Sequence, residues 1–153
     1  MTELTIRRLQ KQEEIPYKLL LLADPSKKNI DIYIFSSDIY IAEKEEKVIA
    51  CYVLKAADSK TIEIKNIAVD PASQGKGIGK FLLNNACEIA SKNGFKNIII
   101  GTGNSSVGQL YLYQQAGFSI IKIIKNFFPD NYDEPIIENG IECRDMLVLS
   151  KAL

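Results

Sequence analysis

The sequence contains no histidine, only three cysteines and no long apolar run. Without histidine, the side chain that most often transfers protons near neutral pH is absent, so acid–base chemistry must use Glu, Asp, Tyr, Lys or Cys. The cysteines Cys51, Cys87 and Cys143 stand far apart, without the paired spacing of a zinc site. We therefore expect free thiols and no bound metal.

The sequence also lacks an excess of either charge, because 19 basic residues balance 19 acidic ones. A balanced composition gives no reason to expect a nucleic-acid partner. No window approaches the roughly 18 apolar residues of a membrane span, and the charged N-terminus does not resemble a signal peptide. We expect a cytoplasmic protein with neither a nucleic-acid nor a membrane partner.

The length of 153 residues predicts one domain spanning residues 1–153. Apolar periodicity and turn residues predict strands at 2–9, 39–43, 48–56, 61–69, 97–101, 118–125 and 141–150, and helices at 13–23, 25–36, 78–93 and 105–115. Asp24-Pro25 ends the first helix, and Asp24 or Ser26 caps the second. Residues 127–140, with two prolines, are expected to be irregular. This order predicts an α/β (α+β) fold in which antiparallel strands precede a β-α-β crossover.

The most informative segment is Gln-Gly-Lys-Gly-Ile-Gly at residues 74–79, between a predicted strand and a predicted helix. Its glycines let the backbone approach a ligand, and the free N–H groups at the helix N-terminus can hold a pyrophosphate. Lys76 and Lys80 flank this turn. Cations at a helix N-terminus oppose the macrodipole, which favours an anionic ligand over the alternative of two solvated lysines.

Two common phosphate-binding motifs do not match this turn. A P-loop requires glycine where Gln74 stands and Ser or Thr where Phe81 stands. The dinucleotide fingerprint G-x-G-x-x-G fails in both registers, because Lys80 or Leu82 occupies the third glycine position. The pattern that does fit is Gln/Arg-x-x-Gly-x-Gly/Ala.

This pattern resembles the signature of the GNAT superfamily of N-acetyltransferases. Further segments agree in the expected order, namely Ile-Ala-Val-Asp-Pro at 67–71, Gly94-Phe95, and Tyr113 followed by Gly117-Phe118. The resemblance covers residues 62–118. It implies a central mixed, mostly antiparallel twisted sheet of about seven strands with about four flanking helices and splayed central strands. A bulge in the strand at 63–69 would accompany this splay.

The resemblance also implies acetyl-CoA as the co-substrate. Main-chain groups at 67–69 would contact the pantetheine arm, and the glycine turn would hold the pyrophosphate. The implied cofactor contacts are Ile67, Ala68, Val69, Gln74, Gly75, Lys76, Gly77, Ile78, Gly79, Lys80 and Asn104. For Asn104 the alternative is a helix cap shared with Ser105 or Ser106.

Two catalytic candidates follow from the resemblance. Tyr113 matches the family tyrosine that protonates the leaving thiolate, and it could alternatively be a core tyrosine. Tyr111 lies about 200° around the helix, so both cannot face the sulfur. Glu63 stands where some relatives carry a catalytic base, although others use ordered water. A base is expected because deprotonating a lysine-like amine at pH 7 costs roughly 4.6 kcal/mol.

The acceptor would contact the loop at 127–140, where we single out Phe128, Tyr132 and Glu134. Aromatic rings and carboxylates suit a cationic amine, although a solvated acidic loop is equally consistent with them. The leading hypothesis is an N-acetyltransferase acting on a small cationic amine. A protein or peptide acetyltransferase is the runner-up, and a non-catalytic acyl-CoA-binding sensor is a third possibility. A homodimer is conceivable.

Overall fold

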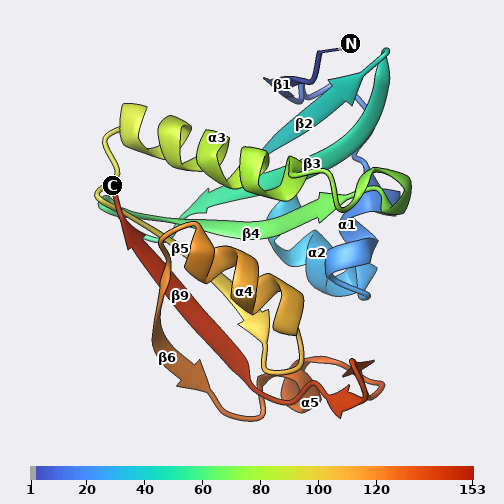
Figure 1. Cartoon of the computed structure of the whole chain (residues 1–153), viewed down its shortest axis with the longest axis vertical. Coiled ribbons are helices and arrows are strands. Elements are labelled where there is room, and N and C mark those ends of the chain that lie inside the picture. The colour runs from blue at the N-terminus through green and yellow to red at the C-terminus, as the bar shows by residue number, and fades with distance from the viewer. Residues whose placement is uncertain (1–2) are drawn as a thin grey trace.

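The computed structural model describes residues 3–153 (Figure 1). A seven-stranded sheet has the order β1-β2-β3-β4-β5-β9-β6, and β7 and β8 form a separate hairpin. The elements are β1 (Thr5–Arg8), α1 (Tyr17–Ala23), α2 (Lys27–Ile34), β2 (Asp38–Lys44), β3 (Lys47–Ala56), β4 (Thr61–Val69), the 3-10 helix η1 (Pro71–Ser73), α3 (Ile78–Lys92), β5 (Asn97–Gly103), α4 (Val107–Gln115), β6 (Ser119–Ile124), α5 (Phe127–Asn131), β7 (Ile137–Glu138), β8 (Ile141–Glu142) and β9 (Met146–Ala152). Among the described residues, no helix has the length and apolar character needed to cross a membrane.

The predicted fold class is confirmed. All neighbouring strands of the large sheet pair antiparallel except β4 and β5, which are parallel and joined through α3. The first helix begins at Tyr17 rather than at residue 13, because Pro16 occupies its N-cap. Thr2, where the first strand was expected to begin, lies outside the described residues.

The C-terminal quarter differs from the sequence-based expectation in two places. Residues 127–131, expected to be irregular, form a fifth helix, in which Pro129 occupies the first turn. Proline is tolerated there because N–H groups of the first turn have no intrahelical partner. The last strand of the sheet begins at Met146 rather than at 141, because Ile141–Glu142 pairs with β7. Asn139 and Gly140, with φ of 55° and 73°, form the turn of that hairpin.

Both faces of the sheet are covered by helices. Six consecutive residues of β3, from Ile49 to Leu54, are buried. Tyr52 and Leu54 pack in the core beneath α3 and α4, whereas Cys51 and Val53 pack against α1 and α2. This alternation follows from the period of two in a strand.

The central strands separate at a bulge. β4 and β5 pair only from Thr61↔Asn97 to Ile64↔Ile100, and beyond Ile64 they diverge toward the side where α1 and α4 lie (Figure 1). Lys65 is an extra residue in β4, because Val53 pairs with Asn66 while Leu54 pairs with Ile64. One extra residue moves the following side chains to the other face. The predicted bulge and splay are thus confirmed.

Candidate active site

The glycine turn forms one wall of a cavity of about 340 Å³ at the open end of the splay. Its lining residues include Ile67, Val69, Ser73, Gln74, Gly75, Gly77, Ile78, Gly79 and Lys80. Gly75 and Gly77 have φ of +76° and +81°, a left-handed conformation that side chains disfavour. Gly79 has a different constraint, since a Cβ there would lie 3.3 Å from Leu112 Cδ2 of α4.

The turn carries uncompensated positive charge. The first turn of α3 has no acidic residue, and neither Lys76 nor Lys80 forms an ion pair within residues 3–153. Gln74 Nε2 donates to the Val69 carbonyl at 3.0 Å and so ties the turn to the end of β4. Free N–H groups, two lysines and room above the glycines fit the phosphates of a coenzyme A molecule.

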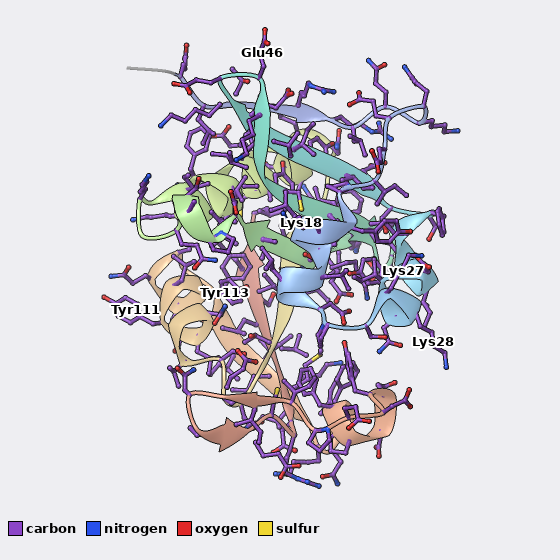
Figure 2. All side chains as sticks on the ribbon, turned by 90° about the vertical axis from the view of Figure 1, so that its right-hand side faces the viewer. Lys18, Lys27, Lys28, Glu46, Tyr111 and Tyr113 are labelled. Carbon is purple, nitrogen blue, oxygen red and sulfur yellow. The ribbon has the colours of Figure 1, made fainter. Side chains whose placement is uncertain are left out.

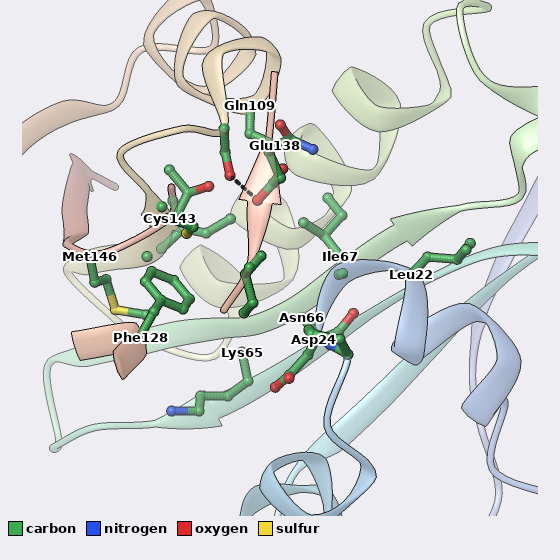
Figure 3. Close-up of a pocket in the computed structure, with 18 of the residues that line it drawn as sticks. Leu22, Asp24, Lys65, Asn66, Ile67, Gln109, Phe128, Glu138, Cys143 and Met146 are labelled. Carbon is green, nitrogen blue, oxygen red and sulfur yellow. Dashed lines mark hydrogen bonds between the residues drawn. The ribbon is translucent and has the colours of Figure 1, made fainter. Parts of the chain in front are cut away.

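A second cavity of about 360 Å³ adjoins the first (Figure 3). Ile67, Gln109 and Tyr113 line both cavities, so the two meet at these side chains. The second cavity extends from the splayed strands to the loop after α1 and to α5. Its acidic lining residues are Asp24 and Glu138, which stand on opposite sides of it in Figure 3.

Tyr113 lies where the two cavities meet. Its side chain is 4% exposed, and burial raises the pKa of its phenol. The hydroxyl makes no hydrogen bond with residues 3–153, so within this part of the chain it has no competing acceptor. A neutral phenol at this position can donate a proton. Tyr111 is 66% exposed and lies at the outer surface of α4, as Figure 2 shows.

Glu63 lies in a neighbouring cavity of about 200 Å³ that Tyr113 does not line. Its Oε1 is 3.4 Å from Lys65 Nζ. The structure therefore does not bring Glu63 and Tyr113 together in one cavity.

Three of the sequence-predicted cofactor residues do not line the cavity beside the turn. The Ala68 side chain is buried on the α1 side of the sheet, and Lys76 is exposed on the turn. The side chain of Asn104 is bonded within the chain, since Oδ1 accepts from the N–H groups of Arg144 and Asp145 at 2.8 and 3.0 Å.

Two of the three predicted acceptor contacts, Phe128 and Tyr132, line the 360 Å³ cavity. Glu134 lines a smaller cavity of about 160 Å³ on the other side of Phe128. The structure thus places both aromatic residues of the predicted set, but not its carboxylate, in the larger cavity.

Of the two acidic residues of the larger cavity, sequence reasoning missed Asp24, whereas Glu138 lies in the acidic loop at 127–140 but was not singled out. Asp24 carries the signal of a cap, and its Oδ1 does accept from the Ser26 N–H at 3.2 Å. Burial raises the pKa of Asp24, although a hydrogen bond from Tyr132 opposes that rise. Glu138 accepts from Ser106 Oγ at 3.0 Å. Nothing local in the sequence distinguishes these two carboxylates from surface ones.

Comparison with known proteins gives consistent matches. Residues 6–118 match the profile described as Acetyltransferase (GNAT) family. The uncharacterized N-acetyltransferase YvbK of Bacillus subtilis is 47% identical over 149 residues, which are 97% of this chain and 96% of that protein. A GNAT family acetyltransferase from Elizabethkingia anophelis with acetyl-CoA bound is 53% identical, with a TM-score of 0.96 over 98% of each chain. An IAA acetyltransferase from Bacillus cereus is 49% identical, with a TM-score of 0.95 over 99% of this chain and 100% of that one.

Proposed function

This chain belongs to the GNAT family of acetyltransferases, and we propose that it acetylates the primary amine of a small cationic molecule. It is an N-acetyltransferase whose co-substrate is acetyl-CoA. The acceptor proposal rests on one observation, the cavity of about 360 Å³. This cavity contains two carboxylates, and at Tyr113 it meets the cavity beside the glycine turn.

The glycine turn and the splayed strands are the donor site in this proposal. The amides of residues 75–80, together with Lys76 and Lys80, bind the phosphates, and the open edge of β4 beyond Ile64 binds the pantetheine arm. The thioester then lies near Tyr113, at the junction of the two cavities. This position gives the acceptor amine access from the second cavity alone.

The reaction proceeds by direct attack. The neutral amine nitrogen forms a bond to the acetyl carbon, the carbon–sulfur bond breaks, and Tyr113 donates its proton to the departing sulfur. The proton lost by the amine passes to a base or to water, and Glu63 stays a candidate for that base. Tyr113 is held neutral by burial, so its proton is available throughout the neutral range.

A small acceptor is favoured over a peptide by the form of the second cavity. The loop after α1 and the end of α5 both border it, and they are joined by the hydrogen bond from Tyr132 to Asp24. A protein substrate would need an open groove, and this contact bridges the site where such a groove would run. A peptide acetyltransferase therefore stays the second candidate.

Release of free thiol from acetyl-CoA tests the proposal. The acceptors should include polyamines, aminoglycosides, amino acids, peptides and IAA, since the Bacillus cereus relative is named for IAA. Turnover of a small cationic amine is the expected result. Turnover of peptides alone would favour the second candidate, and acetyl-CoA binding without turnover of any acceptor would favour a sensor.

A further inference from the structure

Asp24 lies at the C-terminal end of α1, and the bulge of β4 fixes the position of that end. The Leu20 carbonyl accepts two hydrogen bonds, one from the Asp24 N–H at 3.1 Å and one from Asn66 Nδ2 at 3.0 Å. Asn66 points toward α1 because the extra residue Lys65 moves the side chains that follow it in β4 to the other face of the sheet. The bulge that separates the central strands therefore also fixes the end of the helix from which Asp24 emerges.

The carboxylate itself is held on one oxygen only. Asp24 Oδ1 accepts from the Tyr132 hydroxyl at 2.8 Å and from the Ser26 N–H at 3.2 Å. The hydrogen bonds that Asp24 receives within residues 3–153 come from Tyr132 and Ser26 alone, and both reach Oδ1 rather than Oδ2. A second contact, from Asn29 Nδ2 to the Asn131 carbonyl at 2.9 Å, joins the same two segments. The chain thus orients Asp24 in the cavity and leaves one oxygen free.

The other charged groups of this cavity are Lys65 and Glu138. Lys65 Nζ lies 3.4 Å from Glu63 Oε1 and 5.4 Å from the centre of the Tyr33 ring, and in Figure 3 its chain points away from Asp24. Glu138, on the opposite side, accepts from Ser106. The charge of Lys65 lowers the pKa of Asp24 but does not cancel the rise that burial causes. Asp24 is partly buried and forms no ion pair within residues 3–153, so a cationic ligand can stabilise its carboxylate.

We propose that Asp24 binds the ammonium group of the acceptor as it enters, before the amine loses its proton to the base or to water and attacks, and that Tyr132 is the positioning residue for the Asp24 carboxylate. This inference rests on the proposed function and narrows its acceptor class. The surrounding side chains of Leu22, Ile64, Ile67, Phe128, Ile136 and Met146 bind an apolar body. The acceptor is therefore a primary amine on an alkyl or aromatic skeleton, rather than a heavily hydroxylated one.

Binding of a matched pair of probes tests this assignment. Phenethylamine and 2-phenylethanol share one apolar body and differ in charge, and each is titrated by calorimetry into the full-length protein saturated with coenzyme A. The unmodified protein is expected to prefer phenethylamine about 10- to 100-fold, as expected for a hydrogen bond between charged groups. In D24N this preference should fall to near one while the affinity for 2-phenylethanol stays unchanged.

The variants separate charge from structure. Asparagine can still accept from Tyr132 and from the Ser26 N–H, so D24N keeps the turn and removes only the charge. Y132F keeps the charge and removes its positioning bond, and its preference for the amine should fall several-fold. D130N is the control, since Asp130 is exposed on α5 and lines none of these cavities. D130N removes the same charge and should leave the preference unchanged.

The possible results all decide the assignment. An amine preference that survives in D24N would overturn it and would point to Glu138. Equal affinity of the unmodified protein for the two probes, or no binding of phenethylamine, would overturn it as well. If D24N does not fold, the preference of Y132F for phenethylamine over 2-phenylethanol decides the assignment, and an unchanged preference would overturn it. A failed thiol-release panel would remove the proposed function without affecting this binding result.

Discussion

Tyr111 and Tyr113 lie two positions apart on α4, yet one side chain is 66% exposed and the other 4% exposed. Two positions correspond to about 200° around a helix, so the two rings must point in nearly opposite directions. Tyr111 accepts a hydrogen bond from Gln115 at the surface. Tyr113 instead faces the junction of the two cavities, where the proposed mechanism places the leaving sulfur.

At the residue scale we predict that Y113F lowers kcat about 100-fold or more, because it removes a proton donor used in the transition state. The phenyl ring keeps the packing, so the affinity for acetyl-CoA should hardly change. Steady-state kinetics and calorimetry measure the two quantities. Y111F serves as the control and should behave like the unmodified enzyme. Near-normal rates in both variants would reassign Tyr113 as a structural residue.

At the element scale, the turn between β4 and α3 combines two separate requirements for glycine. Gly75 and Gly77 need the left-handed conformation, and a Cβ at either position would meet no atom within 4 Å. The space above them is therefore open to a ligand. Gly79 is needed for packing, because α4 approaches it closely through Leu112. The same three glycines thus form the proposed phosphate site and place α4, with Tyr113, beside it.

We predict that G77E abolishes acetyl-CoA binding while the protein stays folded, because it places bulk and negative charge where phosphates would bind. Calorimetry with acetyl-CoA gives the affinity, and circular dichroism checks the fold. G94E is a matched control. Gly94, after α3, also has positive φ and no atom within 4 Å of a built Cβ, so it tests backbone strain alone. Unchanged affinity in folded G77E would place the donor site elsewhere.

At the scale of the whole molecule, ligand binding should stabilise the fold. Strand pairing joins the two halves of the sheet at only four positions of the described chain, between β4 and β5 from Thr61 to Ile64. A co-substrate bound between them adds contacts to both halves.

We predict that acetyl-CoA at 100 times its Kd stabilises the folded protein by about 2.7 kcal/mol, through mass action. For a domain of this size, each kcal/mol raises Tm by about 2–4 °C, so the shift should be about 5–11 °C. Differential scanning fluorimetry measures it, with G77E as the variant in which it disappears. A shift that persists in G77E would contradict the donor-site assignment.

Burial also makes the molecule sensitive to alkali. It raises the pKa of Cys51 and that of Tyr33 to about 12, and it raises those of Tyr52, Tyr113 and Tyr132 as well. In the unfolded chain the thiol ionises near pH 9 and the phenols near pH 10. Above these values the unfolded state binds fewer protons than the folded state, so stability falls as the pH rises.

We therefore predict that the free energy of unfolding is lost progressively from about pH 9 upward, first through Cys51 and then through the buried tyrosines. Urea denaturation between pH 7 and 11 measures this loss. Part of the tyrosinate absorbance should appear together with unfolding. If all seven tyrosines ionised while the protein stayed folded and equally stable, the assigned burial would be wrong.

The sequence by itself determined the parts of this protein that depend on local chemistry. The glycine pattern at residues 74–79 indicated the turn and its ligand class, and strand and helix periodicity indicated the order of elements. The spacing from Tyr113 to Gly117, matched to the family motif, predicted which of two tyrosines is catalytic. These features are readable because a turn, a cap or an amphipathic face needs particular residues within a few positions of each other.

Only the tertiary structure decided which acidic residues share the proposed acceptor cavity. Asp24 and Tyr132 are 108 positions apart, and the fold brings them together through the bulge at Lys65 and the helix α5. Local sequence offers Asp24 as one of two caps for α2, a role that Ser26 takes in the structure. It does not distinguish Asp24 from Glu63 and Glu134 as a functional acid. The charge that remains uncompensated in a cavity depends on long-range packing, because local sequence does not specify which partners a side chain meets.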